Sequence, residues 1–385
     1  MGDSRARYKR FFVFAYRKDN ICLKMKRVKV SIITVCLNSE ETIEQTINSV
    51  LSQDYDNIEY IIVDGGSSDR TCEIIEKHID SIAIYISEKD DGIYYAMNKG
   101  ISASTGEIIG IVNSDDWLEP MAIERVVDAF TEENVDIVHG NINSVDAYGQ
   151  CTVSKPNVSD PNPWLAMMVK HPATFVRKRV YDQLGVFRPE YSIAADYEFI
   201  LRCYTHNMVF RYIDSILSNF RRTGISESRG SDCLREVRKI LYEYREYIDS
   251  FRDVINARNI QIRRRVFYEK MEKKDPELMD CFLALSNNSK SIAIWGAGTW
   301  GKNCVRFFRD SKVNIRFIAD GDSRKIGTKI EDVFVVDKEM LLDCAVDAIL
   351  VSIINLNDPL LQEVKKKHDV ILIQDWVDKS KEDSL

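Results

Sequence analysis

Two neighbouring carboxylates, Asp115 and Asp116, follow an apolar run at residues 108–112. Such a run is typical of a strand buried in a sheet, so we expect both side chains at the end of that strand. Adjacent carboxylates repel each other and favour a hard divalent cation, which would bridge the two phosphates of a sugar nucleotide. The alternative interpretation is a turn that caps a helix starting near Pro120.

A second polar group follows the apolar run at residues 58–63, where the chain reads Asp-Gly-Gly-Ser-Ser-Asp. Ligands of open parallel sheets bind at the carboxyl ends of the strands. There a carboxylate would accept a hydrogen bond from a nucleotide base or ribose, and glycine would let the backbone approach the ligand. An ordinary turn and a helix N-cap are the alternatives. The residues expected to contact the nucleotide are Thr34, Asn38, Asp64, Gly65 and Ser67.

The segment between these two groups, residues 90–100, reads as a turn and a short helix that ends in Asn-Lys-Gly. Asp91, Asn98 and Lys99 would place polar groups and a cation near the phosphates. The alternative is a capped helix on the surface without a ligand.

A further carboxylate, Asp196, stands at the expected start of a helix, where it suits a general base and a helix cap equally well. Glu198 and Arg202 follow at i,i+4 spacing, which predicts an ion pair on that helix. We expect His171 to shape an acceptor pocket, and a hydrogen-bonded core histidine is the alternative.

A complete G-x-G-x-x-G motif, formed by Gly296, Gly298 and Gly301, follows an apolar run near the C-terminus. Asp320 ends the next apolar run, where a dinucleotide-binding fold places its ribose-binding acid, so NAD or another nucleotide is the expected cofactor. The unit has only about a hundred residues, which leaves room for one mononucleotide half. An interaction or regulatory module is therefore the alternative.

The elements that must position these residues alternate between apolar runs and helical spacing, which predicts an α/β fold with a parallel sheet. Strands are expected at residues 28–35, 58–63, 82–86, 107–112 and 136–139, with helices at 41–51, after Ser68, at 94–102 and after Pro120. Strands of the C-terminal unit are expected at 291–295, 315–319, 333–336, 348–353 and 370–373. Residues 231–284 lack strand signals and are interpreted as two or three connector helices.

We therefore divide the chain into a basic aromatic arm (1–27), a first α/β domain (28–225), a helical connector (226–288) and a small Rossmann-like domain (289–385). Residues 1–30 contain ten Lys or Arg against two Asp, although the whole chain has a net charge of -7. Such an arm could contact an anionic membrane surface peripherally, or pack on the first domain with its charges solvated. Because the rest of the chain is acidic, nucleic acid is not an expected partner.

No window approaches about 18 uninterrupted apolar residues, so no membrane-spanning helix is expected. The nine cysteines follow no metal-ligand or redox spacing, which favours reduced thiols in a cytoplasmic protein, peripheral at the inner face of the membrane if the arm binds there. A homo-oligomer is compatible with this composition.

Taken in order, the motifs resemble glycosyltransferase family 2 over about residues 28–225. Several motifs in a fixed order are far more specific than any one of them. Asn113 replaces the frequent first Asp of the family's metal motif, and Ala195 replaces a Glu before Asp196. The matching segments are residues 30–34, Asn38, 63–69, 92–94, 98–100, 104–106, 113–116, 171–177 and 184–187, followed by Asp196.

The resemblance implies a GT-A-type fold and an inverting, metal-dependent hexosyltransferase that uses a nucleotide diphosphate sugar, with UDP favoured. It implies that Asp64 holds the base, that Asp116 and Asp115 bind Mn²⁺ or Mg²⁺, and that Asp196 is the catalytic base. The acceptor would be a glycan or lipid-linked saccharide in surface polysaccharide assembly.

Two other enzyme classes remain as alternatives. One is an NAD-dependent sugar-modifying oxidoreductase centred on the C-terminal domain. The other is a nucleotidyltransferase, although the Gly-rich, Lys-bearing loop usual in that class is missing after Ile33.

Overall fold

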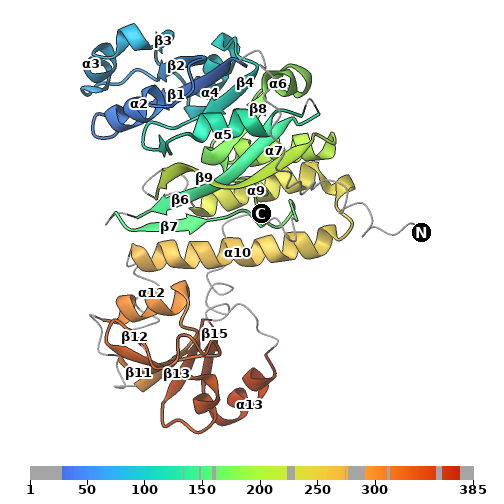
Figure 1. The fold of residues 1–385 in the computed structure, drawn as a ribbon. Coiled ribbons are helices and arrows are strands. Elements are labelled where there is room, and N and C mark those ends of the chain that lie inside the picture. The colour runs from blue at the N-terminus through green and yellow to red at the C-terminus, as the bar shows by residue number, and fades with distance from the viewer. Residues whose placement is uncertain are drawn as a thin grey trace, which may run out of the picture. The chain divides into compact units, whose positions relative to one another are not determined.

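The computed structural model describes residues 28–132, 134–146, 149–157, 162–222, 230–273, 275, 291–309, 313–352 and 358–372 of the 385-residue chain. It divides into two compact units, one ending at Arg258 and the other starting at Asn259 (Figure 1). The basic arm expected at residues 1–27 lies outside the described residues.

The first unit is built on a mixed sheet in which the strands lie in the order β3-β2-β1-β4-β8-β6-β9-β5, with β7 paired to β6. The first four strands of this order are parallel, as the sequence predicts. Beyond them the prediction of a parallel sheet is wrong, because β8 runs antiparallel to both β4 and β6. The strands are β1 (Val30–Cys36), β2 (Ile58–Asp64), β3 (Ile84–Ser87), β4 (Ile108–Ile111), β5 (Trp117–Leu118), β6 (Ile137–Val145), β7 (Cys151–Ser154), β8 (Thr174–Arg177) and β9 (Phe210–Arg221).

Helices cover both faces of this sheet, because successive side chains of a strand point to opposite faces. In β1, Val30 and Ile32 belong to one apolar core, and Ile33 and Val35 belong to the other. The first core includes side chains of α2 (Ile43–Leu51), α3 (Thr71–Glu76) and α5 (Ala122–Ala129). The second includes those of α4 (Ile93–Ala103), α6 (Lys178–Leu184), α7 (Ala195–Thr205) and α9 (Gly230–Glu243).

Helix α4 lies unusually close to β1, and a glycine makes this possible. A Cβ at Gly100 would come within 2.4 Å of Ile33 Cγ2, which is closer than any real contact. The expectation that the helix ends in Asn-Lys-Gly is wrong, because residues 98–100 lie inside α4, which ends at Ala103, and Gly100 is there for close packing.

Helix α9, which the sequence assigns to a connector, packs into the core of the first unit beside α7 (Figure 1). Its Val237, Ile240 and Leu241 are buried there. The next helix, α10 (Phe251–Glu272), contributes Val254 and Ile255 to the same core, and the boundary between the units falls inside it. The site-bearing unit thus extends beyond the segment in which the sequence places its motifs.

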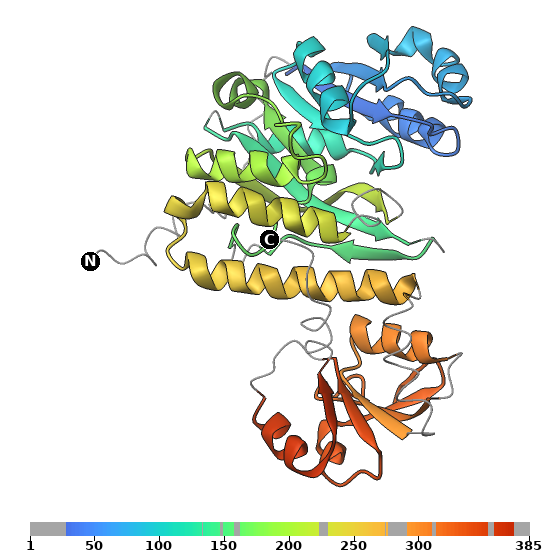
Figure 2. The same cartoon turned by 180° about the vertical axis from the view of Figure 1, so that it is seen from behind.

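The second unit contains a six-stranded sheet in the order β12-β13-β11-β10-β14-β15, parallel except for β12 (Figure 2). Ile292 and Ile294 of β10 belong to one core, and Ala293 and Trp295 belong to the core on the other face. The expected strands are confirmed in type and order. The elements are β10 (Ser291–Trp295), α12 (Thr299–Phe308), β11 (Asn314–Asp320), β12 (Lys329–Ile330), β13 (Val333–Asp337), β14 (Ala348–Val351), α13 (Pro359–Lys367) and β15 (Val370–Leu372).

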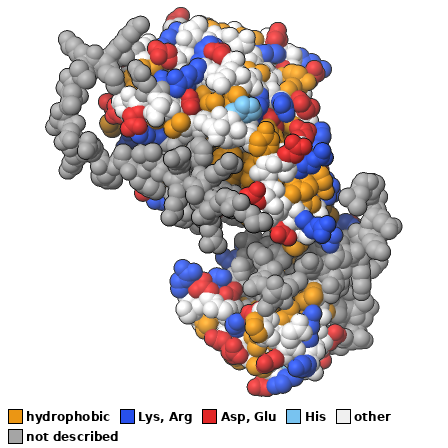
Figure 3. Space-filling view, turned by 90° about the vertical axis from the view of Figure 1, so that its right-hand side faces the viewer, with side chains coloured by type: hydrophobic (Ala, Val, Ile, Leu, Met, Phe, Trp, Pro, Cys, Tyr) orange, Lys and Arg blue, Asp and Glu red, His pale blue; other side chains and the backbone are white. Residues whose placement is uncertain are grey.

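Within the described ranges, no helix has both the length and the apolar character needed to cross a membrane. Acidic and basic side chains are interspersed on the face of the molecule shown in Figure 3.

Candidate active site

The two adjacent carboxylates lie between β4 and β5, as the sequence predicts. The helix-capping alternative is wrong, because β5 follows directly and the N-cap of α5 is Met121. Asp116 is 1% exposed, and its Oδ1 accepts a hydrogen bond of 3.0 Å from a backbone N–H. Its Oδ2, like Asn113 Oδ1 nearby in sequence, is buried with no hydrogen-bond partner among the described residues. Buried polar oxygens are rarely left unpaired, so this pair of atoms fits a bound ligand.

Burial makes both carboxylates hard to ionise. Burial and then the neighbouring Asp115 raise the pKa of Asp116 well above its ordinary value, and burial raises the pKa of Asp115. A cation favours the ionised forms and would reverse these shifts.

Arg221, at the end of β9, is the residue that the sequence reasoning missed here. Its backbone N–H donates to Asp116 Oδ1, and its Nε donates to the Asp115 carbonyl at 2.9 Å. Its guanidinium lies 4.8 Å from the centre of the Trp117 ring and donates to Gln45. No sequence signal points to this contact, because only the pairing of β5 with β9 brings the residues together.

A divalent cation fits the chemistry of this turn. Carboxylate and amide oxygens are ligands that Mg²⁺ and Mn²⁺ prefer, and Asp116 Oδ2 has no hydrogen-bond partner among the described residues. The part of the chain that the structure describes holds no group of three or more His, Cys, Asp or Glu side chains suited to a metal. Phosphate oxygens and water would therefore have to complete the coordination.

Asp64 ends β2 and is fully buried, but protein donors already occupy both of its oxygens. Burial would raise the pKa of this carboxyl, yet the hydrogen bonds from Ser67 and Ser87 outweigh it and the pKa is lowered. A base or ribose would have to replace one of these donors. They are the backbone N–H groups of Gly66 and Ser67, the hydroxyls of Ser67 and Ser87, and the thiols of Cys36 and Cys72.

The end of β1 is joined to this loop through Asn38. Its backbone N–H donates to Ser67 Oγ at 2.8 Å, and its Oδ1 accepts from the Ser68 N–H at 2.8 Å. The N-cap alternative is wrong, because Thr42 is the N-cap of α2. Thr34 is fully buried, and its hydroxyl forms a hydrogen bond of 3.1 Å with the Tyr60 hydroxyl. This hydroxyl is therefore part of the core of the first unit.

The turn before α4 places Asp90, and not the expected Asp91, against the Asp64 loop. A Cβ at Gly65 would lie 3.1 Å from both carboxylate oxygens of Asp90, so glycine here makes room for that side chain. Asp90 Oδ1 accepts from the Gly92 N–H at 3.2 Å, while its Oδ2 is buried and unpaired as far as the described residues go. Asp91 itself is exposed. The sequence contains two adjacent Asp residues here, and no periodic pattern indicates which of them faces the Asp64 loop.

Two residues of the Asn-Lys-Gly segment make contacts within the protein. The Asn98 amide forms two hydrogen bonds with the backbone of Phe187, at 2.8 and 3.0 Å. The Lys99 ammonium lies 2.9 Å from Glu88 Oε1. Asn98 thus fastens the loop after α6 to α4, and Lys99 is paired with an exposed carboxylate.

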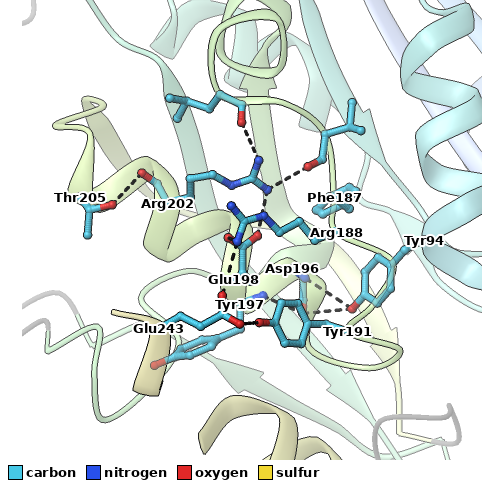
Figure 4. Close-up of polar contacts among 12 residues, drawn as sticks. Tyr94, Phe187, Arg188, Tyr191, Asp196, Tyr197, Glu198, Arg202, Thr205 and Glu243 are labelled. Carbon is cyan, nitrogen blue, oxygen red and sulfur yellow. Dashed lines mark hydrogen bonds and ion pairs between the residues drawn. The ribbon is translucent and has the colours of Figure 1, made fainter. Parts of the chain in front are cut away.

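Asp196 lies in the first turn of α7, whose N-cap is Ala194, so its interpretation as the N-cap is wrong. Its Oδ1 accepts a hydrogen bond of 2.8 Å from the backbone N–H of Tyr197, the next residue of the same helix. The same oxygen lies 3.2 Å from the Tyr94 hydroxyl of α4 (Figure 4). Both of these donors are directed at Oδ1 and leave Oδ2 to other partners, which suits a carboxylate that accepts a proton from a substrate.

His171 belongs to a short 3-10 helix, His171–Ala173, and its ring lies edge-on to Phe187 with centroids 6.0 Å apart. Burial lowers the pKa of His171, and the negative charge of Asp196 partly opposes this. Its Nε2 is buried and finds no partner in the described ranges, so the hydrogen-bonded core histidine of the alternative interpretation does not describe this atom.

Two residues beyond Asp196, the fully buried Glu198 forms the expected ion pair with Arg202 at 2.9 Å (Figure 4). Its other oxygen lies 3.2 Å from Arg188 and accepts from the hydroxyl of Tyr244, the residue directly after α9, at 2.8 Å. The charge is therefore compensated on both oxygens.

In the second unit the glycine motif forms a tight turn between β10 and α12. A Cβ at Gly301 would lie 1.8 Å from the Gly296 carbonyl oxygen, and Gly298 is the N-cap of α12. Asp320, the expected ribose-binding acid, accepts from the Ala297 N–H at 2.6 Å. It also accepts from the Asp322 N–H and lies 3.2 Å from Lys325 Nζ. Its carboxylate thus accepts a hydrogen bond from the glycine turn itself, and a ribose would have to replace one of these donors.

A model of the family described as glycosyl transferase family 2 matches residues 31–183. An uncharacterized glycosyltransferase of Mycobacterium tuberculosis is 29% identical over 252 residues, which cover 62% of this chain and 92% of that protein. A PGL/p-HBAD biosynthesis glycosyltransferase of Mycobacterium bovis is 27% identical over 201 residues, covering 50% of this chain and 77% of that protein.

Among solved structures, a mannosyltransferase from Pyrobaculum calidifontis in complex with GDP-Man and Mn²⁺ has a TM-score of 0.49 and 16% identity, over 60% of this chain and 69% of its own. S. aureus TarS 1-349 in complex with UDP-GlcNAc has a TM-score of 0.46 and 21% identity, over 56% of this chain and 66% of its own. The family match covers β1 to β4 and the carboxylate turn. Glycosyltransferase family 2 is thus the family that residues 31–183 of this chain match.

Proposed function

We propose that the first unit is an inverting glycosyltransferase that moves a sugar from a UDP-linked donor to a hydroxyl of a glycan or lipid-linked saccharide in surface polysaccharide assembly. The observation that carries this proposal is the buried carboxylate turn, in which Asp116 Oδ2 and Asn113 Oδ1 lack a partner among the described residues. The preference for UDP, and the acceptor class, come from the family resemblance alone.

The donor would bind at the carboxyl ends of β1, β2 and β4, where the family motifs meet. The Asp64 loop, which Asn38 joins to β1, would receive the nucleoside. Asp115 and Asp116 would hold a divalent cation against the diphosphate, and when bound this cation offsets the negative charge of the leaving group. Arg221 keeps the turn in place and adds a positive charge beside it.

The acceptor would bind between this turn and the N-terminus of α7. Asp196 would take the proton from the attacking hydroxyl as its oxygen forms a bond to the anomeric carbon. The bond from that carbon to the diphosphate breaks on the opposite face, so the nucleotide diphosphate leaves and the anomeric configuration inverts. His171, with its uncharged ring favoured by burial, would line the acceptor side.

The decisive experiment is a calorimetric titration of UDP, GDP and dTDP into the full chain, with and without manganese. We expect manganese-dependent binding of UDP and its loss in Asp116→Asn, whereas Asp182→Asn, which changes an exposed carboxylate of α6, should bind normally. The same titration with NAD tests the oxidoreductase alternative. If none of the three nucleotide diphosphates binds in the presence of manganese, the result would contradict the transferase proposal.

A further inference from the structure

The loop that leads into Asp196 is held by a carboxylate on another helix. Glu236 of α9 accepts hydrogen bonds from the backbone N–H groups of Ser192, Ile193 and Ala194 at 2.9, 2.8 and 2.9 Å. It also accepts from the Ser192 hydroxyl at 2.7 Å. One side chain therefore binds four donors from three consecutive residues that precede α7.

This arrangement uses the full accepting capacity of an ionised carboxyl group, in which each oxygen takes two donors. The three N–H groups belong to residues that lead into the helix, where backbone donors lack partners within the helix. The negative charge also lies near the positive end of the α7 dipole. Each bond involves a charged acceptor, so the set is stronger than four neutral hydrogen bonds.

Other contacts of α9 keep Glu236 in place. Val237, Ile240 and Leu241 of the same helix are buried in the core that α7 also enters. Further along α9, Glu243 accepts from the Tyr191 hydroxyl, just before the loop (Figure 4). The helix therefore contacts this segment at two points, and the burial of its apolar face fixes where those contacts lie.

We propose that Glu236 is a positioning residue that places the Asp196 carboxylate for proton transfer. This inference rests on the proposed function, in which Asp196 is the base. Residue 236 lies beyond the segment that matches the family model, so α9 supplies part of the active-site geometry from outside the family motifs. Displacement of a catalytic group by about 1 Å can slow a reaction by about 100-fold.

The test compares Glu236→Gln with wild type in the release of UDP from UDP-GlcNAc and UDP-glucose, assayed in the full chain with manganese. An amide can accept at only one of its two ends and presents donors at the other, so the loop loses contacts on that side. We expect kcat to fall by about 10- to 100-fold while KM for the donor changes less than about twofold. In the ligand-free Glu236→Gln variant, the amides of residues 192–194 should exchange hydrogen faster than in ligand-free wild type.

Ser192→Ala removes one of the four bonds and should lower kcat in the same direction by about two- to fivefold. Glu246→Gln, an exposed carboxylate after α9, is the matched control and should behave like wild type. If kcat of Glu236→Gln falls by no more than the fraction of folded protein does, as measured by circular dichroism, the result would contradict a positioning role.

Asp196→Asn tests the base assignment separately from the positioning role of Glu236. If Asp196→Asn is inactive and Glu236→Gln turns over like wild type, only the positioning inference fails. If Asp196→Asn itself retains wild-type turnover, the base assignment of the proposed function fails, and the inference fails with it.

Discussion

The Tyr94 hydroxyl lies 3.2 Å from Asp196 Oδ1 and 2.8 Å from the Ile193 carbonyl oxygen, across 102 residues of sequence in the first case. Burial, and then the charge of Asp196, raise the pKa of Tyr94 well above its ordinary value, so the hydroxyl keeps its proton. Helix α4, whose first turn follows the Asp90 loop, is thereby connected directly to the start of α7.

We predict that Tyr94→Phe lowers kcat by about tenfold with little change in KM for the donor, because Asp196 loses a fixed donor. Stability should fall by only about 1 kcal/mol, the net value of one hydrogen bond. Steady-state kinetics and urea unfolding measure the two effects. Tyr95→Phe, at an exposed position next to it, is the control, and equal kinetics for both variants would contradict the prediction.

A second prediction concerns the cost of ionising Asp116. The pKa of Asp116 is raised in the folded chain, so folding favours its protonated form. The stability that the protonated side chain contributes is fully present below the ordinary pKa of 3.8, and it is lost as the pH rises through the raised pKa. At pH 7 without metal, Asp116→Asn should therefore be more stable than wild type.

Urea unfolding in EDTA at pH 7 and pH 4 measures this difference, which should shrink at the lower pH. Manganese should stabilise wild type and not the variant. Asp182→Asn should show neither effect, and a variant less stable than wild type at pH 7 in EDTA would refute the argument.

The buried ion pair of α7 gives a third prediction. Arg202→Ala leaves the fully buried Glu198 with less compensation and removes donors to the carbonyls of Leu184 and Val186, so unfolding free energy should fall by about 3–5 kcal/mol. Lys155→Ala breaks the more exposed pair with Asp214 and should cost less than about 1 kcal/mol. Chemical denaturation of both variants checks the contrast, and similar losses would show that burial is not the deciding factor.

The fourth prediction is for the second unit. Since the Asp320 carboxylate already accepts from two backbone N–H groups and contacts Lys325, we expect millimolar NAD to leave the melting temperature unchanged. Asp320→Ala should destabilise this unit by about 1–3 kcal/mol, because the Ala297 N–H loses its partner. Saturable NAD binding that Asp320→Ala abolishes would instead support a dinucleotide site.

Local pattern was enough to predict much of the first unit. Apolar runs and helical spacing identified β1, β2, β4 and their helices, because each element buries a face whose period is visible in the sequence. The same pattern placed Asp64 at the carboxyl end of β2 and the pair Asp115 and Asp116 after β4, as the structure does. It also predicted the strands of the second unit and the Glu198–Arg202 pair, which depend on near neighbours in the chain.

What the tertiary structure alone decided depends on contacts between distant residues. The packing of the loops decides whether protein donors occupy the Asp64 carboxylate, and whether Asp90 or Asp91 lies against the Asp64 loop. The sequence gives only the order of these loops along the chain. Arg221 reaches Asp116 across 105 residues, and Glu236 reaches Ile193 across 43. Such pairings are set by the order of strands and by the burial of whole helices, which hydrophobic period and motif spacing do not encode. The sequence by itself determined which chemical groups the site contains, and the packing of β9 and α9 decided how they are held.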